Sequence, residues 1–267
     1  MKKLSIAMLS MVLAGSMLLT GCGGDKTPAQ DGADASADTA TEYKLASEGK
    51  LTMATNAYFD PWEYYEGENI VGIDPEVAQA IADKLGLELV ITDMDFDSII
   101  TAVAAGKADM GMAGMTVTEE RKLNADFSQT YASAIQAIVV PEGSAIKTAD
   151  DMAGKKIGVM QGFTGDLECT KQFGEESVVR FNKSAEAVMA LTQGKIDCVV
   201  IDNEPAKKIV AANEGLSILD SKYTQEDYAI AFAKDNTALR DAVDKALGEL
   251  IEDGTVEKIM NKYITAD

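Results

Sequence analysis

The chain has 267 residues, 46% hydrophobic and 25% charged, enough to bury one large core or two modest ones. Its 44 acidic and 24 basic residues give a formal net charge of −20, which repels phosphate backbones, so we expect no nucleic-acid partner. The absence of histidine excludes Ser-His-Asp triads and His-ligated metal sites, and three cysteines are too few for a disulfide scaffold; we expect no metal and no cofactor.

The first segment has the form of an export signal. Two lysines precede an apolar run at residues 4–19, which is shorter than the roughly 20 residues that a spanning helix needs. The sequence Leu-Thr-Gly-Cys at residues 19–22 resembles the bacterial lipobox, in which the signal is cut before a lipidated cysteine. We therefore expect a lipoprotein signal peptide over residues 1–21 and lipidation of Cys22. The alternative is an ordinary signal peptide with an incidental cysteine.

Residues 22–42 contain mainly Gly, Ala, Asp, Ser and Thr, without apolar periodicity. Such a segment cannot bury enough surface to fold, so we expect a flexible tether between lipid and domain. From Cys22 onward no apolar run is long enough to cross a bilayer, which leaves the acyl group as the only expected anchor. The expected location is extracytoplasmic, on the outer face of the cell membrane, in a periplasm or on a Gram-positive-type surface.

From residue 50 onward, short apolar strands alternate with amphipathic helices. In the first half we expect strands at 51–55, 87–91 and 108–113 and helices at 75–85 and 97–105. The second half repeats this order, with strands at 156–160, 178–181 and 196–201, a helix opening at Gly165, and a helix capped by Ser184 and ending at Gly194. The order favours mainly parallel sheets covered by helices.

Two segments, residues 136–140 and 228–232, are expected to connect the halves. The predicted class is therefore α/β with two lobes, each a mainly parallel sheet with flanking helices, joined by two crossing hinge strands. The predicted boundaries assign 43–137 and 231–267 to lobe 1, completed by helices at 237–251 and 256–263, and 138–230 to lobe 2.

One short motif occurs in both halves. Gly-Lys-Ala-Asp at residues 106–109 and Gly-Lys-Ile-Asp at residues 194–197 each begin a strand after a helix. Five residues after each aspartate the strand has run out, at Gly114 and at Asp202. Ligands of open parallel sheets bind beyond the carboxyl ends of strands, so these two residues are expected on opposite walls of one cleft.

The run at residues 113–121 favours a carboxylate site. Thr116 and Glu119 have capping-box spacing, and the free N–H groups of a helix start attract anions. Arg121, one turn later, offers a planar fork that matches a carboxylate. The alternative is a surface arginine paired with Glu120 or another acid.

Other candidates lie at strand ends. Asp202 suits an ammonium group, although an aspartate there also suits helix capping. The turn at 161–165 could bind a small anion, and it lacks the lysine and spacing of a nucleotide-binding loop. Aromatic residues at 58–65, together with Phe96, could cover an aliphatic chain or a cation, or they could simply pack the core.

Residues 50–263 resemble the amino-acid-binding components of polar amino acid ABC transporters, the solute-binding group that contains the glutamine-, histidine- and lysine/arginine/ornithine-binding proteins. This resemblance implies the type II periplasmic-binding-protein fold. The segments that carry it are residues 54–56 through 61–63, 71–74, 94–96, 113–121, 126–128 and 197–202.

The resemblance implies a role for each matching residue. Arg121 would hold the ligand α-carboxylate, aided by Thr116 and by Thr164 from the opposite lobe. Gly114 and Asp202 would hold the α-ammonium. The full set of implied ligand-binding residues is Asn56, Phe59, Trp62, Phe96, Gly114, Met115, Thr116, Arg121, Thr164 and Asp202.

The sequence also departs from its relatives. Asn56 stands where several members use an aspartate, and Ile201 stands where the glutamine binder has a histidine. In the glycine-rich turn, Met160 and Phe163 replace more polar residues.

The resulting hypothesis is a monomeric, non-enzymatic solute-binding lipoprotein. It would capture a free L-amino acid, with a polar or basic side chain favoured, by hinge closure and deliver it to the permease subunits of an ABC importer. The alternatives are a dehydratase-like enzyme with a carboxylate such as Glu63 as base, and an amino-acid-sensing module. A redox pair of Cys169 and Cys198 is less favoured than buried thiols or a structural disulfide.

Overall fold

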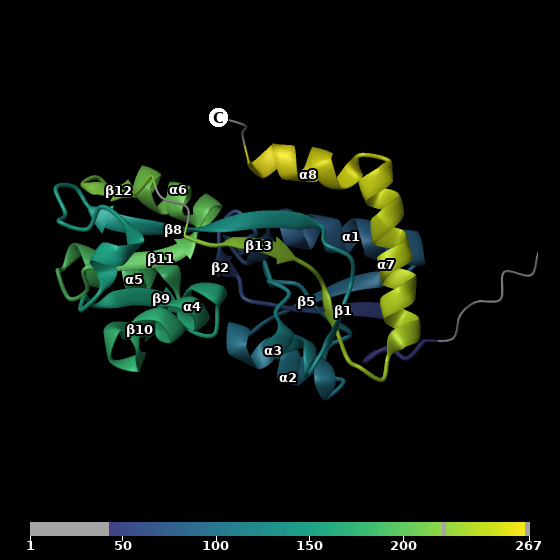
Figure 1. The fold of residues 1–267 in the computed structure, drawn as a ribbon. Helices are drawn as coiled ribbons and strands as arrows, with labels where there is room; N and C mark the ends of the chain where they lie inside the picture. The colour runs from purple at the N-terminus through teal and green to yellow at the C-terminus, as the bar shows by residue number, and fades with distance from the viewer. Residues whose placement is uncertain (1–42, 221–222, 265–267) are drawn as a thin grey trace, which may run out of the picture. The chain divides into compact units, whose positions relative to one another are not determined.

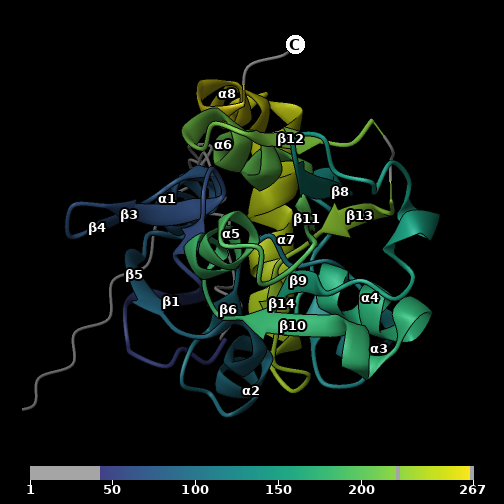
Figure 2. The same cartoon turned by 90° about the vertical axis from the view of Figure 1, so that its left-hand side faces the viewer.

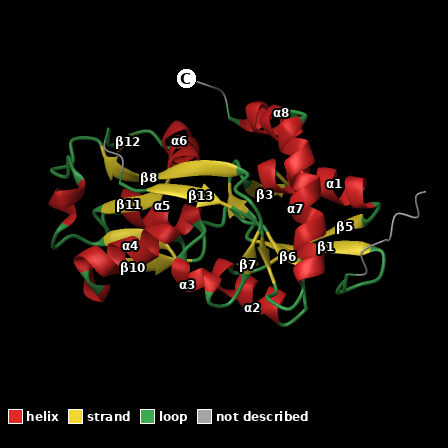
Figure 3. Cartoon of the chain, turned by 45° about the vertical axis from the view of Figure 1, so that its right-hand side comes forward, coloured by secondary structure: helices red, strands yellow, loops and turns green. Residues whose placement is uncertain are grey.

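The computed structural model describes residues 43–220 and 223–264. The predicted signal peptide, the tether and Cys22 lie outside these residues. The described chain contains two large sheets and one small one, which Figures 1 and 3 draw with their helices. We call the part around the first large sheet lobe 1 and the part around the second lobe 2. The α/β two-lobe class expected from the sequence is confirmed.

The lobe 1 sheet is mixed, and its central strand β1 pairs in parallel with β5 and β6. Five of the six β1 residues are buried, because both faces of this strand are covered. The strands in spatial order are β5 (Glu88–Asp93), β1 (Lys50–Thr55), β6 (Met110–Gly111), β14 (Ala231–Phe232) and β7 (Asp126–Phe127).

Helices α1, α7 and α8 contact one another beside this sheet (Figure 3). In α1, Val77 and Ile81 lie four residues apart on the buried face, and the helix ends at Gly86, whose φ of 69° is left-handed. The lobe 1 helices are α1 (Ile73–Leu85), η1 (Phe96–Ser98), α2 (Ile99–Ala104), α3 (Glu119–Lys122), α7 (Thr237–Glu252) and α8 (Thr255–Tyr263).

In the lobe 2 sheet, β9 pairs in parallel with β10 and β11, while β8 is antiparallel to its neighbours. Helices α4 and α5 pack on β9, β10 and β11, as the view onto lobe 2 in Figure 2 shows. The strands are β10 (Val178–Phe181), β9 (Ile157–Met160), β11 (Cys198–Asp202), β8 (Ala132–Pro141) and β12 (Leu216–Ile218), with β13 (Gln225–Tyr228) paired to β8. The helices are η2 (Ala149–Met152), α4 (Thr164–Phe173), η3 (Glu175–Ser177), α5 (Ser184–Thr192) and α6 (Asn203–Ala212).

The chain crosses between the lobes slightly earlier than expected. Residues 136–139 of β8 already pair with β11 in the lobe 2 sheet, so the first crossing lies between β7 and the start of β8. The return crossing runs from β13, which pairs with the start of β8, to β14, as expected for residues 228–232. The two crossing segments therefore lie side by side (Figure 1).

The aromatic segment after β1, for which no strand was predicted, forms a small antiparallel sheet. It consists of β2 (Tyr58–Phe59), β3 (Glu63–Glu66) and β4 (Asn69–Val71). Alternation is hard to recognise in strands of two to four residues, which explains the omission.

The repeated motif has the same structural role in both lobes. The Asp109 carboxylate accepts the amide of Thr52 at the start of β1, and the Asp197 carboxylate accepts the amide of Lys156 just before β9. Both preceding glycines are left-handed, Gly106 with φ of 67° and Gly194 with φ of 66°. Each motif thus ties the end of a helix to the start of a neighbouring strand.

Candidate functional site

Arg121, on α3, is a buried cation that links the two lobes. Its guanidinium is 7% exposed, donates to the carbonyl of Thr116 at 2.7 Å and to the carbonyl of Gly162 in lobe 2 at 2.9 Å, and lies 5.1 Å from the ring centre of Phe96. Burial lowers the Arg121 pKa to about 10, which leaves the guanidinium charged at neutral pH. The alternative of a surface arginine paired with an acid is therefore wrong.

The expected helix cap at Thr116 is also wrong. Thr118 is the capping residue of α3, and its hydroxyl accepts the Arg121 amide at 3.1 Å. The Thr116 hydroxyl instead donates to the Glu226 carboxylate. Since α3 has only four residues, its start adds little to anion binding.

A chain of polar side chains leads from lobe 2 through lobe 1 and back. Thr164, at the start of α4, donates to the hydroxyl of Thr116 at 2.8 Å, and Thr116 donates to Glu226. The Gln136 side-chain amide donates both to Glu226 and to Asp202. Five buried residues of both lobes thus form one hydrogen-bonded network around Arg121.

Asp202 occupies the N-cap position of α6, as the alternative interpretation proposed, but its side chain makes no capping hydrogen bond. It is 2% exposed and turned toward Gln136. Burial and the neighbouring Glu226 carboxylate raise the Asp202 pKa well above its usual range. Asp202 and Arg121 therefore belong to one buried cluster.

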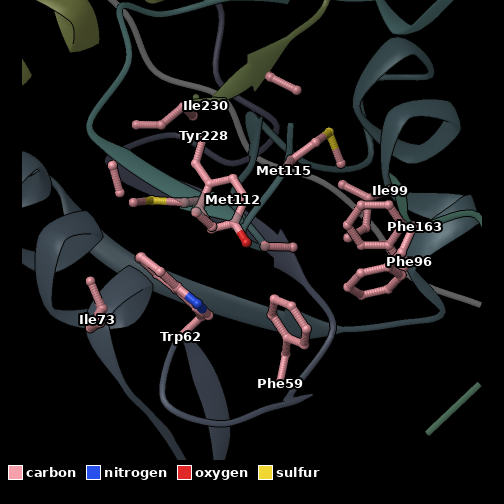
Figure 4. Packing of buried hydrophobic residues seen from close by; sticks show 14 of the residues in the cluster. Phe59, Trp62, Ile73, Phe96, Ile99, Met112, Met115, Phe163, Tyr228 and Ile230 are labelled. Carbon is pink, nitrogen blue, oxygen red and sulfur yellow. The ribbon is translucent and has the colours of Figure 1, made fainter. Parts of the chain in front are cut away.

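Three aromatic rings from two lobes meet beside Arg121. Phe59 and Phe96, both predicted from the sequence, come from β2 and η1 of lobe 1. The third ring is Phe163 of lobe 2, whose centre lies 3.8 Å from that of Phe96 and 5.0 Å from that of Phe59. Figure 4 shows Phe96 and Phe163 stacked against each other, with Phe59 nearby.

A second polar group lies deeper in lobe 1. Trp62 is 1% exposed and meets Tyr228 edge to face, with ring centres 4.9 Å apart. Figure 4 shows the Trp62 indole nitrogen and the Tyr228 hydroxyl directed into the space beside Phe59. Neither atom has a hydrogen-bond partner at good geometry in the described chain. Buried donors of this kind are rare unless something else satisfies them.

Glu63 and Asp74 form a buried carboxylate pair in the same region. Asp74 accepts the Gly114 amide at 2.8 Å and the Tyr131 hydroxyl at 2.9 Å. Glu63 is 0% exposed and its oxygens meet no N–H donor and no hydroxyl among the described residues, but its carboxyl group lies within hydrogen-bonding reach of Asp74. Burial raises the Asp74 pKa to about 6, and burial together with the Asp74 charge raises the Glu63 pKa well above its usual range.

The remaining predicted residues are also buried here. Asn56 donates to the Met94 carbonyl at 2.9 Å, and its amide oxygen has no partner in the described ranges. Met115 is 0% exposed and lines a cavity of about 480 Å³ with Phe96, Arg121 and Gly162. Gly114 has φ of 53°, and a side chain there would meet the Phe59 ring at 3.0 Å.

The buried charges of this region do not balance. The region contains one buried guanidinium and four buried carboxylates, of which Asp202 and Glu226 act on the guanidinium; the set is Arg121, Glu63, Asp74, Asp202 and Glu226. Of these, Asp74 and Glu226 were missed as site residues, and so was Gln136. Glu226 occupies a buried position of β13, but the sequence Gln-Glu-Asp-Tyr has no apolar alternation that would have predicted this burial.

Cys169 and Cys198 are buried free thiols, and burial raises the pKa of each to about 12. In this arrangement the two cysteines are separate buried thiols, and a raised pKa disfavours the reactive thiolate form. In the part of the chain that the structure describes, His, Cys, Asp and Glu side chains form no group of three or more that could hold a metal ion. No helix of that part has the length and apolarity to cross a membrane.

Two lobes joined by two neighbouring crossings, with a buried charged cluster between them, define the architecture of periplasmic binding proteins. The profile of the bacterial extracellular solute-binding proteins, family 3, matches residues 51–266. The chain belongs to this family.

Named relatives agree with this assignment. The arginine-binding extracellular protein ArtP of Bacillus subtilis is 37% identical over 224 residues, 82% of this chain and 87% of the relative. An ancestral arginine-binding protein bound to glutamine is 40% identical, with a TM-score of 0.78, and covers 82% of this chain and 100% of its own. The substrate-binding protein AbpA of Streptococcus pneumoniae, bound to L-arginine, is 33% identical with a TM-score of 0.76. The match covers 82% of this chain and 96% of AbpA.

Proposed function

We propose that this protein binds a free L-amino acid between its lobes and delivers it to an ABC importer. The observation that carries the proposal is the burial of opposite charges near one another at the lobe interface, with Asp202 and Glu226 close enough to act on Arg121. An amino-acid zwitterion matches that pattern, because its carboxylate suits the guanidinium and its ammonium suits the carboxylates. Thr116 and Thr164 supply further hydrogen-bond partners from both lobes.

The preferred ligand is an amino acid with a cationic side chain. If the ligand carboxylate neutralises Arg121 and its ammonium faces Asp202 and Glu226, the pair Glu63 and Asp74 still lacks a positive charge. Buried ionised carboxylates are costly unless they are paired, so a distal guanidinium or ammonium would stabilise them. The arginine-binding relatives support the same ligand class.

Binding would proceed by hinge closure about the two crossing segments. Arg121 belongs to lobe 1 and Asp202 to lobe 2, so a zwitterion that contacts both stabilises the closed arrangement over an open one. In this proposal the hinge consists of the chain between β7 and β8 and the chain between β13 and β14.

We assign Glu63 an electrostatic role in binding and no role as a catalytic base. Its pKa lies well above the usual range, because the side chain is fully buried beside Asp74. A raised pKa favours the protonated form, which cannot accept a proton, and a nearby ligand cation would favour the charged form. The protein is accordingly proposed to be a binding protein and not an enzyme.

The sequence of residues 19–22 supports a lipid anchor at Cys22, on the outer face of the cell membrane. We propose that the protein works there as a monomer, with permease subunits as its protein partners. The family to which the chain belongs is extracellular, which agrees with this location.

A thermal-shift screen of the purified protein against the free L-amino acids tests the ligand class. A ligand at about 1,000 times its dissociation constant stabilises the folded state by about 4 kcal/mol, which a melting curve resolves. Arginine and lysine are expected to raise the melting temperature most. A response confined to acidic or aliphatic amino acids would refute the cationic class, and no response to any would refute the proposed function.

A further inference from the structure

The turn between β9 and α4 reaches from lobe 2 into lobe 1 with four consecutive residues. The Gln161 side-chain amide donates to the Asp97 carboxylate at 2.7 Å, and the carbonyl of Gly162 accepts from Arg121 at 2.9 Å. Next in the chain, the ring of Phe163 stacks on Phe96, and the hydroxyl of Thr164 donates to that of Thr116 at 2.8 Å. We call residues 161–164 the interlobe turn.

The local geometry of the interlobe turn allows this close approach. Gly162 has φ of 75°, and a side chain there would lie 3.1 Å from the Cβ of Asp97. The amide of Gly162 is held at 2.9 Å by Asp166, one turn into α4, and Asp166 in turn pairs with Arg180. The turn is therefore braced from within lobe 2 and presents its outer face to lobe 1.

The contacts of Phe163 coincide with those proposed for the ligand side chain. The ring is 5% exposed, is tilted by 33° against Phe96 and meets Phe59 edge to face at 62°. Such arrangements stabilise aromatic pairs beyond the area that they bury. Phe59 and Phe96 are the two rings expected to hold the ligand side chain, so Phe163 occupies the face that the ligand would use.

The contact of Gly162 coincides in the same way with that proposed for the ligand carboxylate. Its carbonyl accepts an N–H of the Arg121 guanidinium, and a carboxylate bound in bidentate fashion would need the N–H groups of that same fork. The chain thus satisfies both anchor points of the site, one polar and one aromatic, with its own groups.

We propose that the interlobe turn is an intramolecular latch, in which Phe163 competes with the ligand side chain for Phe96 and thereby sets the affinity. This inference rests on the proposed function, since it concerns the same site. The latch contacts use groups of the chain alone, so they favour closure of the lobes when no ligand is bound. A ligand must displace them, and that displacement reduces its apparent affinity.

The decisive variant is Phe163→Leu, which keeps an apolar side chain and removes the ring. Losing one aromatic stack of about 1 kcal/mol corresponds to a roughly fivefold change in an equilibrium constant. We expect the dissociation constant for arginine, measured by titration calorimetry, to fall by about that factor. We also expect a larger radius of gyration by small-angle X-ray scattering in ligand-free solution, because closure is weakened.

Gln161→Ala, which removes the contact with Asp97, should likewise increase the radius of gyration of the ligand-free protein. Phe173→Leu, at the far end of α4, is the matched control for loss of a lobe 2 ring and should change neither quantity. Circular dichroism melts verify that each variant is folded.

A weaker affinity for arginine in Phe163→Leu would overturn the latch and make Phe163 a ligand contact. Unchanged affinity and scattering would overturn it as well. If the wild-type protein bound no amino acid, the proposed function would fail, while the scattering of the same variants would still decide whether the interlobe turn holds the lobes together.

Discussion

The guanidinium of Arg121 in lobe 1 donates to the backbone carbonyl of Gly162 in lobe 2 over 2.9 Å. A second N–H group of the same side chain donates to the Thr116 carbonyl. Both acceptors are neutral backbone carbonyls, so neither offsets the guanidinium charge, and a carboxylate could add a bidentate, charge-paired contact. An anionic group that reached this guanidinium would therefore be bound strongly, and the first prediction follows.

Arg121→Ala is expected to weaken binding of any amino acid by about 30-fold or more, because truncating one partner of a buried charge pair costs about 2–5 kcal/mol. Titration calorimetry measures the loss. Arg240→Ala is the matched control, since Arg240 pairs with Asp126 and Asp241 at the surface. Near-wild-type affinity in Arg121→Ala would remove this residue from the binding site.

Glu63→Gln is expected to reduce the preference for cationic side chains. The substitution keeps the shape of Glu63 and removes its charge, so affinity for arginine should fall by at least about tenfold. Affinity for citrulline, the neutral isostere of arginine, should change little. Glu66→Gln, at the exposed end of the same strand, serves as control. An equal loss for both ligands would show that Glu63 acts on packing and not on charge.

The pH dependence of folding stability and of ligand affinity should follow the titration of the pair Glu63 and Asp74. This pair lies beside Tyr131, and Asp93 and Asp202 are further nearby charges. The folded-state pKa of Asp74 is raised to about 6, above its usual value of 3.8, so the folded state binds the proton more tightly than the unfolded state. This group alone therefore adds to the free energy of unfolding as pH falls from about 7 toward 4.

Melting curves of the ligand-free wild type and of Asp74→Asn, compared over that range, isolate this contribution. The difference in melting temperature between the two proteins should shift in favour of the wild type on acidification. Arginine affinity should change in the opposite direction, because a bound cation is stabilised by ionised carboxylates. Below about pH 6 the affinity should fall by up to roughly tenfold per pH unit for each carboxylate that becomes protonated. Affinity that stays constant from pH 7 to 5 would contradict the role of the pair.

Gly72→Ala is expected to destabilise the protein by about 3 kcal/mol or more, because Gly72 has φ of 131° and an added Cβ would lie 2.3 Å from the Trp62 carbonyl oxygen. Gly67→Ala is the control, with φ of 65° and open space around it, so only the cost of the backbone conformation remains, about 1 kcal/mol. Urea denaturation measures both. Equal losses would show that the contact with Trp62 is relieved by a small shift.

Cys22→Ser should abolish lipid attachment and leave ligand binding unchanged. Metabolic labelling with a radioactive fatty acid, followed by detergent phase partitioning, tests the first point, and calorimetry tests the second. Labelling that persists in the variant would place the lipid elsewhere. A wild-type protein that takes up no label would favour an ordinary signal peptide.

Local patterns were sufficient to predict the elements that bury a regular face. Helix α1 was expected at 75–85 and spans Ile73–Leu85, because Val77 and Ile81 recur at helical spacing before a terminating glycine. The fully buried strands β9 and β11 were recognised as short apolar runs. The hairpin strands β2 and β3 were not, since their pairing depends on contacts between segments and not on periodicity.

Residue types at strand ends identified Arg121 and Asp202 as candidates, because a guanidinium or carboxylate after a buried strand is suited to a ligand at a sheet edge. The sequence alone therefore determined the α/β class and one pair of opposite charges. Only the tertiary structure brought Glu63, Asp74 and Glu226 together with them, since those carboxylates come from β3, α1 and β13, far apart along the chain. It likewise placed Phe163 between two rings of the other lobe, because stacking depends on how the lobes meet and not on the residues that flank the ring.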